Sequence, residues 1–332
     1  MSNVVRHSFS NWRRWSRQRR DRMRQKYLIF WIECISQYCV SLINKTNHMS
    51  TIKNANVLVT GGANGIGKLM GLKCLQEGAA NLIIWDINEE NLFKTQKEFN
   101  SKGYNNVHTY VVDVSNVNDI ERNATEVLLE IGNVDMLFNN AGIVAGKKSF
   151  WEHTAKDIEK TLSINISGVM NVTRVFIQDM IKQRKGHIIN IASASGLIPL
   201  PKGSVYASSK WAVLGWSESL RMEFELEGKD LHVTTVCPSF IDTGMFKGVK
   251  APLLFPLLQP DDVVTKIIKA VKNNDTILMM PENVNIVPFL KGVFSGKIFD
   301  KVAGFLGVYS SMNSFEGRPE NERVPEKKTK AK

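Results

Sequence analysis

The chain has 332 residues, of which 43% are hydrophobic, enough to build one large domain or two modest ones. Its net charge of +11 is unevenly distributed. Residues 1–49 carry ten basic and two acidic side chains, residues 318–332 carry six and three, and residues 50–317 carry 27 of each. A nucleic-acid-binding domain would be basic on one face, so the neutral body argues against nucleic acid as a partner. We expect a basic extension, a globular body and a charged tail with these bounds.

The cysteines and histidines do not form a metal-binding pattern. The four cysteines, at positions 34, 39, 74 and 237, make no C-x-x-C pair, and the six histidines are scattered. Zinc sites show closely spaced Cys or His ligands. The sequence therefore predicts structural cysteines in a reduced compartment and no metal centre.

The N-terminal extension combines a basic cluster with an amphipathic segment. Residues 13–26 (RRWSRQRRDRMRQK) contain eight basic side chains, and residues 27–43 (YLIFWIECISQYCVSLI) follow. A membrane span needs about 20 apolar residues, and this stretch is shorter and contains Glu33 and Gln37. On a helix, its apolar residues fall on one face. The pattern predicts an amphipathic helix lying in a membrane surface through residues 13–43, with the body facing the cytosol.

Three interpretations of this extension stay open. It is a membrane anchor, in-plane or marginally spanning, or an amphipathic helix packed on the body, or a disordered or misannotated leader. If the leader is misannotated, translation starts at Met49, which opens MSTIKNANVLVTGG, and the protein is cytoplasmic. No small-residue cleavage site follows the apolar run, which argues against a cleaved secretory signal.

A glycine-rich turn follows the first strand-like run of the body. Residues 56–60 (NVLVT) precede GGANGIG at 61–67, and residues 68–77 have the pattern of a helix. In a dinucleotide-binding unit, glycines let the backbone approach the pyrophosphate and the helix N-terminus supplies N–H donors. The turn therefore predicts a phosphate-binding loop at Gly61, Gly65 and Gly67. An ordinary glycine-rich turn is the alternative.

Asp86 ends the second strand-like run, NLIIWD at 81–86. A carboxylate at this place accepts hydrogen bonds from both hydroxyls of the adenosine ribose and repels a 2′-phosphate. Asn64 in the glycine loop is neutral, whereas a basic residue there would favour NADP. Both residues favour NAD over NADP as the cofactor.

Strands and helices continue to alternate along the body. Residues 108–114 and 134–142 have strand patterns, and residues 116–131 between them have a helical pattern. Regular alternation of this kind predicts an α/β fold with a doubly wound parallel sheet and helices on both faces. A cofactor would then lie across the carboxyl ends of the strands.

Tyr206 and Lys210 lie four residues apart in the run YASSK. On a helix this spacing places the phenol beside the ammonium, and a nearby positive charge favours the ionised phenol. Tyr206 could then exchange a proton with a hydroxyl or a carbonyl. A solvated surface pair is the alternative when these two residues are considered alone.

Several motifs follow one another in a characteristic order. They are TGGANGIG, Asp113-Val114, NNAG at 139–142, Asn165, Ser193, YASSK, and CPSFIDT at 237–243. The ordered set resembles the short-chain dehydrogenase/reductase family over residues 53–285. The resemblance implies a single Rossmann-type domain that transfers hydride between NAD(P) and an alcohol, ketone or aldehyde.

The resemblance also implies the catalytic roles. Tyr206 would be the general acid/base, and Lys210 would hold the nicotinamide ribose and favour the ionised tyrosine. Ser193 would hydrogen-bond the reacting oxygen, with Ser195 as the nearby alternative. Asn165 would hold a helix kink and a water that relays protons to Lys210, while a structural asparagine bonded to backbone is the other reading.

The cofactor contacts implied by the motifs lie throughout the body. Asn139 is a further candidate, for the floor under the adenosine. The implied contacts are Gly61, Asn64, Gly65, Ile66, Gly67, Asp86, Asp113, Val114, Asn140, Ala141, Gly142, Tyr206, Lys210, Pro238 and Thr243.

The substrate side is rich in apolar residues. Residues 240–258 lie where the family has a flexible lid. This segment and residues 284–308 are apolar, which favours a lipophilic alcohol or ketone as the substrate. Core packing or a dimer contact is the alternative role for these apolar residues. The runs WDINEENL and SSKWAVLGWSESL resemble the retinol and 17β-hydroxysteroid dehydrogenase branch, which implies an N-terminal membrane segment, retinoid, steroid or other lipid substrates, and a homodimer. A small soluble substrate and a non-catalytic NAD-binding scaffold are the competing hypotheses.

Overall fold

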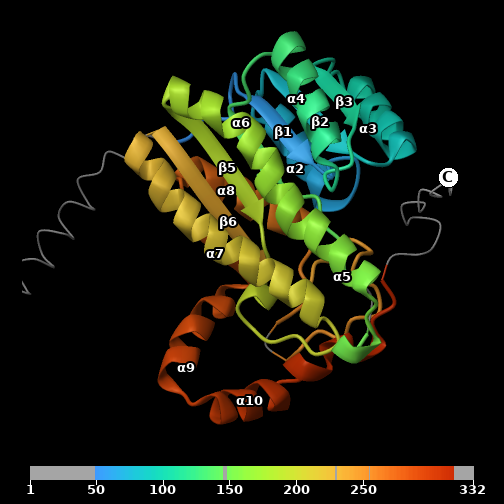
Figure 1. Cartoon of the computed structure of the whole chain (residues 1–332), viewed down its shortest axis with the longest axis vertical. Coiled ribbons are helices and arrows are strands. Elements are labelled where there is room, and N and C mark those ends of the chain that lie inside the picture. Colours follow the sequence, from blue (N-terminus) through green and yellow to red (C-terminus); the bar gives the residue numbers. More distant parts are fainter. Residues whose placement is uncertain (1–48, 145–147, 229, 254, 318–332) are drawn as a thin grey trace, which may run out of the picture. The chain divides into compact units, whose positions relative to one another are not determined.

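The computed structural model describes residues 49–144, 148–228, 230–253 and 255–317 (Figure 1). The predicted membrane segment at 13–43 and the charged tail at 318–332 lie outside the described residues. The described fold is therefore that of the predicted globular body.

The described strands form one parallel sheet in the order β3-β2-β1-β4-β5-β6-β7. Most of their residues are buried from both faces, as expected for apolar strands covered by helices on either side. The strands are β1 (Asn56–Thr60), β2 (Asn81–Asp86), β3 (Val107–Val111), β4 (Met136–Asn139), β5 (Lys185–Ile191), β6 (Asp230–Pro238) and β7 (Ile277–Met280).

Helices cover both faces of this sheet (Figure 1). One core lies under α2 (Gly65–Gln76), α3 (Glu89–Ser101) and α8 (Pro260–Asn273). The other lies under α4 (Val117–Glu130), α6 (Val169–Gln183) and α7 (Ser204–Glu227). The predicted doubly wound parallel sheet with helices on both faces is confirmed.

The predicted strand bounds agree best in the first half of the sheet. The runs at 56–60 and 81–86 are β1 and β2, but the third strand ends at Val111 and the fourth covers only Met136–Asn139. After β3 the chain turns, because the Asn116 amide donates to the Asp113 carbonyl and the Asp113 amide donates to the Asp119 carboxylate. A turn and a helix cap therefore replace the last predicted residues of that strand.

A smaller lobe follows the last strand. Its segments are η4 (Glu282–Ile286), α9 (Val287–Val293), α10 (Gly296–Phe305) and η5 (Val308–Ser314). Figure 1 shows α9 and α10 beyond one end of α7, away from the other helices of the sheet. In the part of the chain that the structure describes, no helix has the length and apolarity to cross a bilayer.

Candidate active site

The site lies where the strand order reverses between β1 and β4. The segments after these strands diverge, and a cleft opens there at the carboxyl ends of the strands. The cleft has a volume of about 890 Å³. All the cofactor contacts predicted by the motifs line it: Gly61, Asn64, Gly65, Ile66, Gly67, Asp86, Asp113, Val114, Asn140, Ala141, Gly142, Tyr206, Lys210, Pro238 and Thr243. The structure brings these residues together, and their contacts with a cofactor remain predictions.

The glycine loop has the backbone geometry of a phosphate cradle. Gly61 and Gly65 have φ of 61° and 55°, values that favour glycine. At Gly67, a Cβ atom would lie 2.2 Å from the Gly61 carbonyl oxygen. The first turn of α2 leaves N–H groups without intrahelical partners, and the Asn64 side chain accepts from only the Gly65 amide, at 2.7 Å. The loop thus fits a pyrophosphate at the start of α2.

Asn140 and Thr60 hold this loop in place. The side-chain Nδ2 atom of Asn140 donates to the carbonyl oxygens of Thr60 and Gly61, at 3.0 Å each. The Thr60 hydroxyl accepts from the backbone amides of Asn140 and Ala141, at 3.0 and 3.1 Å. Thr60 was not among the predicted site residues, although it is the threonine that opens the TGG motif. It joins the ends of β1 and β4 beneath the cleft.

Asn139 has a structural role instead. Its side chain is buried, donates to Thr173 and Asn190 at 2.9 Å each, and does not line the cleft. Strand alternation explains the difference, since adjacent residues point to opposite sides. The interpretation of Asn139 as part of the adenosine floor is therefore not supported by its position, whereas Asn140 faces the cleft.

Asp86 lines the cleft at the end of β2. Its carboxylate accepts from the backbone amides of Ala63, at 3.1 Å, and Asn88, at 3.0 Å. The end of β2 is thereby tied to the glycine loop. Among the described residues that line the cleft, the basic ones are Lys148, Lys160 and Lys210, and none of these lies in the glycine loop or at the end of β2.

Asp113 lies farther along the same edge. Its carboxylate accepts from the Ser115 amide at 3.0 Å and from the Ser115 hydroxyl at 2.6 Å. The backbone of Val114 lies close to Gly168, which is in the helical segment after α5. A Cβ added at Gly168 would lie 2.8 Å from the Val114 carbonyl oxygen. This close approach keeps the segment after β3 along the cleft.

Tyr206, Ser193 and Lys210 meet at the inner end of the cleft. Tyr206 and Lys210 both lie in the first two turns of α7 and are buried. The Lys210 Nζ atom is 5.8 Å from the centre of the Tyr206 ring and donates to the Ile191 carbonyl at 2.8 Å. Ser193 follows β5, and its hydroxyl lies beside the Tyr206 phenol, donates to the Pro238 carbonyl at 3.4 Å and accepts from the Ser195 amide at 3.1 Å. The helix brings the phenol and the ammonium to one side, as the spacing predicts.

Burial has the largest effect on the ionisation of this pair. It raises the pKa of Tyr206 to about 12, and the neighbouring Ser193 hydroxyl opposes that rise. It lowers the pKa of Lys210 to about 8. The predicted effect of Lys210 on the phenol stays a prediction, because burial and Ser193 account for the shift of the Tyr206 pKa in this structure. The geometry therefore keeps Tyr206 protonated at neutral pH.

Asn165 supports the site from beneath. It lies in a π-helical turn, η2 (Ser163–Gly168), between α5 (Ala155–Leu162) and α6, and is fully buried. Its side chain accepts from the Ile143 amide at 2.9 Å and donates to the Ile143 carbonyl at 2.9 Å and to Ser209 at 3.0 Å. This geometry is compatible with both predicted roles: the helix is locally distorted, and the asparagine is bonded to backbone.

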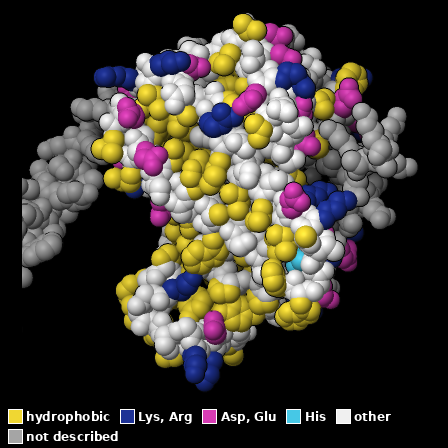
Figure 2. All heavy atoms as spheres, in the orientation of Figure 1, with side chains coloured by type: hydrophobic (Ala, Val, Ile, Leu, Met, Phe, Trp, Pro, Cys, Tyr) yellow, Lys and Arg dark blue, Asp and Glu magenta, His cyan; other side chains and the backbone are white. Residues whose placement is uncertain are grey.

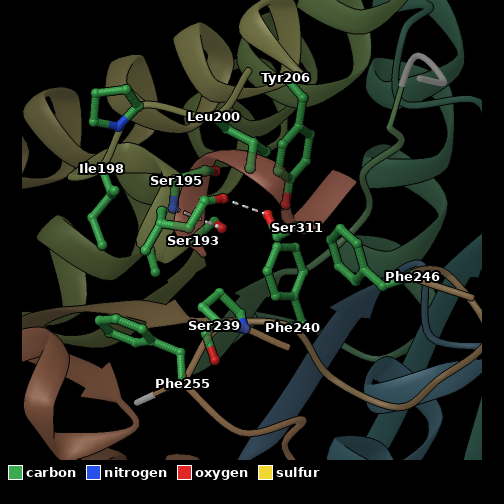
Figure 3. A pocket seen from close by; sticks show the side chains of 14 residues that line it. Ser193, Ser195, Ile198, Leu200, Tyr206, Ser239, Phe240, Phe246, Phe255 and Ser311 are labelled. Carbon is green, nitrogen blue, oxygen red and sulfur yellow. Dashed lines mark hydrogen bonds between the residues drawn. The ribbon is translucent and has the colours of Figure 1, made fainter. Parts of the chain in front are cut away.

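An apolar pocket adjoins the cleft at Tyr206 (Figure 3). Its volume is about 50 Å³. The hydroxyl oxygens of Ser195 and Ser239 are buried there without a hydrogen-bond partner. The other residues that line it are Ser193, Ala194, Ile198, Pro199, Leu200, Tyr206, Phe240, Phe246, Pro252, Phe255, Val308 and Ser311.

The predicted lid at 240–258 forms part of this pocket. The Phe246 ring lies edge-on to Tyr206, with ring centres 6.3 Å apart, and Phe240 lies 5.3 Å from Phe246. The Leu258 amide donates to the Phe240 carbonyl, so the two ends of the lid are joined. Gly244 and Gly248 between them have positive φ, which side chains other than glycine rarely adopt. The lid therefore covers the reactive phenol with aromatic side chains.

Among the other reactive side chains, Cys237 lies next to Ser193 and Lys210 near the end of β6. Among the described residues, no group of three or more His, Cys, Asp or Glu side chains could hold a metal ion. Cys74 and Cys237 are buried free thiols, and Cys34 and Cys39 lie outside the described residues.

Comparison with known proteins shows extensive similarity. The family model for short chain dehydrogenase matches residues 55–253. Epidermal retinol dehydrogenase 2 of Mus musculus is 36% identical over 265 residues, which cover 79% of this chain and 85% of that protein. Estradiol 17-beta-dehydrogenase 11 of Homo sapiens is 34% identical over 238 residues, covering 71% and 78%.

Solved structures share the same fold. A short-chain dehydrogenase/reductase from Burkholderia phymatum in complex with NAD has a TM-score of 0.67 and 26% identity, covering 74% of this chain and 95% of that one. A metagenomic short-chain oxidoreductase in complex with NADP has a TM-score of 0.59 and 25% identity, covering 70% and 97%.

Proposed function

Because the chain belongs to the short-chain dehydrogenase/reductase family, in its retinol and hydroxysteroid dehydrogenase branch, we propose that it interconverts a lipophilic alcohol and its ketone or aldehyde. Family membership makes it an oxidoreductase that acts on CH–OH groups and uses NAD or NADP. The observation that carries the choice of substrate is the apolar pocket, which meets Tyr206 and Ser193 beside the cofactor cleft.

The proposed mechanism assigns proton handling to this chain. When bound in the cleft, the nicotinamide cofactor supplies the hydride acceptor or donor. Tyr206 takes the proton of the alcohol during oxidation and returns it to the carbonyl oxygen during reduction. Ser193 hydrogen-bonds the same oxygen and orients it toward the phenol. Lys210 carries positive charge beside the ribose site, and Asn165 fixes the Ile143 segment that borders it.

Replacing the phenol hydroxyl tests the mechanism. Tyr206→Phe should abolish turnover, because phenylalanine has no hydroxyl with which to exchange the substrate proton. NADH binding, measured by its fluorescence, should stay nearly unchanged, since the glycine loop is remote from the hydroxyl. Normal turnover in this variant would overturn the assignment, and loss of NADH binding would mean that the substitution disturbs the cleft instead.

The substrate class is tested with purified protein and a panel of alcohols. We expect formation of NADH with retinol, steroid or long-chain alcohols and little with short-chain alcohols. The pocket of about 50 Å³ holds only the reacting end of such a molecule, so the lid must move to admit the rest. The same volume favours the competing candidate, a small soluble substrate, which would reverse this preference. No turnover of any alcohol or ketone would support a non-catalytic NAD-binding scaffold.

We propose NAD as the preferred cofactor. Asp86 ends β2 at the cleft, and its negative charge opposes the 2′-phosphate of NADP. Asp86→Ser should improve the use of NADP relative to NAD by tenfold or more. Because Asp86 also accepts from the Ala63 amide, absolute activity should fall with both cofactors, and the ratio of the two kcat/KM values is the measure. An unchanged ratio would show that Asp86 does not select the cofactor.

The remaining partners are proposals from the sequence. Residues 13–43 are proposed to bind a membrane surface, and the body is proposed to form a homodimer through the helices that carry Asn165 and Tyr206. On α7, Trp211, Met222 and Leu226 are exposed apolar side chains, which supports a contact along that helix.

A further inference from the structure

The lobe formed by α9 and α10 exposes apolar side chains that a soluble helix pair would bury. On α9, Phe289 and Val293 lie on one outward face, and Ile286 just precedes it. Ile298, Val302 and Phe305 on α10 have i, i+4, i+7 spacing and are also exposed. Phe305 is 85% exposed. Figure 2 shows hydrophobic side chains gathered over this lobe.

The inner faces of the same helices close the substrate side. Val287, Phe299 and Ala303 are buried in one cluster with Ile198 and Val308, two residues that line the apolar pocket. Each helix is therefore apolar on the side that supports the pocket and on part of the side that faces away from it. A helix that is apolar around so much of its circumference is usually covered on both sides.

The outer face is linked to the lid. The Leu253 amide donates to the Leu306 carbonyl at the end of α10, at 3.0 Å, and the Leu253 side chain is exposed. Phe255, two residues later in the lid, packs in the same cluster as the inner face of α10 and lines the pocket. Whatever covers the outer face thus touches the segment that must move to admit a large substrate.

The charges around this face favour a lipid surface. The lobe, residues 282–314, carries three lysines and two acids, Glu282 and Asp300. Asp300 accepts from the Tyr309 hydroxyl at 2.5 Å. Lys291 lies over the Trp211 ring, at 4.3 Å, and donates to the Leu197 carbonyl, so it fastens α9 to the body. Lys297 and Lys301 lie beside the apolar stripe of α10, where lysines of interfacial helices contact lipid head groups.

We propose that the outer face of α9 and α10 seats on a phospholipid surface that contains anionic lipid. The apolar stripe would enter the head-group region, and Lys297 and Lys301 would meet lipid phosphates. A symmetric contact between two copies would gather Lys297 and Lys301 of both copies in one interface, which disfavours a second copy as the occupant. The contact belongs to the body and is additional to the one proposed for residues 13–43. It does not depend on the reaction proposed above.

The test uses a local probe in the full chain, so that membrane binding through the extension does not hide the result. Phe289 and Phe93 are matched, with exposures of 65% and 66%, and Phe93 lies on α3 at the other end of the fold. Each is changed to cysteine in a chain that carries Cys34→Ser and Cys39→Ser, and is labelled with a nitrobenzoxadiazole dye. The protein is then mixed with vesicles of phosphatidylcholine and phosphatidylserine.

We expect dye fluorescence at position 289 to rise severalfold with vesicles and to be quenched by doxyl-labelled lipid, while dye at position 93 responds to neither. Equal behaviour of the two positions would overturn the proposal. Fluorescence at 289 that rises with protein concentration alone would identify a second copy as the occupant. Fluorescence at 289 that is high at every concentration without vesicles would identify another segment of the chain. Either result overturns the proposal.

Unlabelled variants provide a second measurement. Phe289→Ser should weaken vesicle binding severalfold in a flotation assay, and Phe93→Ser should leave it unchanged. Thermal unfolding and far-UV circular dichroism report whether each variant is folded. Unaltered vesicle binding by folded Phe289→Ser protein would also overturn the proposal.

Discussion

At the scale of single residues, the reactive phenol is governed by two opposing effects. Burial of Tyr206 raises the pKa of the phenol to about 12, and the Ser193 hydroxyl opposes that rise. Desolvation therefore has the larger effect. When NAD⁺ is bound, its positive nicotinamide ring also favours the ionised phenol.

This balance predicts different pH dependence for the two directions of the reaction. Oxidation needs the ionised form of Tyr206, whose share grows about tenfold per pH unit below its pKa. Reduction uses the protonated form, which already predominates at neutral pH. We expect kcat/KM for alcohol oxidation to rise from about pH 6 to 8, below the pH at which Lys210 loses its charge, while kcat/KM for ketone reduction stays nearly constant over that range. Initial rates in both directions measure this.

Oxidation that does not depend on pH would contradict this prediction. If oxidation is independent of pH over the same range, the pKa of Tyr206 in the complex lies below it, and the charges of Lys210 and the cofactor outweigh burial. The comparison needs a substrate without its own titratable group.

At the scale of elements, the glycine loop depends on close approach between backbone segments. Gly67 is required because a Cβ would meet the Gly61 carbonyl at 2.2 Å and the Asn140 side chain at 2.5 Å. The contact joins the start of α2 to the loop and to the end of β4. An added methyl group must push these apart or lift α2 from the sheet.

Gly67→Ala should therefore weaken NADH binding by more than tenfold and destabilise the fold by about 1–3 kcal/mol. Gly215→Ala is the matched control, because Gly215 lies inside α7 with no atom within 4 Å of its added Cβ. That change should leave NADH binding intact and stabilise the fold by up to about 1 kcal/mol. Fluorescence titration and thermal unfolding measure both. Wild-type NADH affinity in Gly67→Ala would contradict the cradle geometry.

At the scale of the whole molecule, two proposed membrane contacts act together. One is the extension at 13–43, predicted from sequence, and the other is the outer face of α9 and α10. Two weak contacts on one chain strengthen each other because the second binds from a high local concentration. The predicted substrate would then reach the apolar pocket from the lipid phase.

Deletion of residues 1–48 should leave turnover of a detergent-solubilised lipophilic alcohol unchanged, since all described site residues lie in the body. It should weaken vesicle binding without abolishing it, and Phe289→Ser in the shortened protein should remove most of the remainder. Flotation and turnover measure the two effects. Full membrane binding after the deletion would show that the extension is not an anchor, and loss of turnover would show that it supports the body.

Local sequence patterns determined much of this protein. The glycine loop, the first two strands and the Tyr206–Lys210 spacing could be predicted because each depends on a few neighbouring residues. The order of motifs was sufficient to indicate a doubly wound sheet, since the alternation of strands and helices restricts the topology. The predicted cofactor residues also line one cleft, because parallel strands place their carboxyl ends at the same edge of the sheet.

Only the tertiary structure decided the features that depend on residues distant in sequence. The apolar pocket combines residues from 193 to 311, and its buried Ser195 and Ser239 hydroxyls could not be recognised in the sequence. The roles of Asn139 and Asn140 were separated by strand orientation. The pKa of Tyr206 depends on how completely the lid and the η5 segment bury it. The body covers one face of α9 and α10 and leaves the other exposed, and no local pattern distinguishes those two faces.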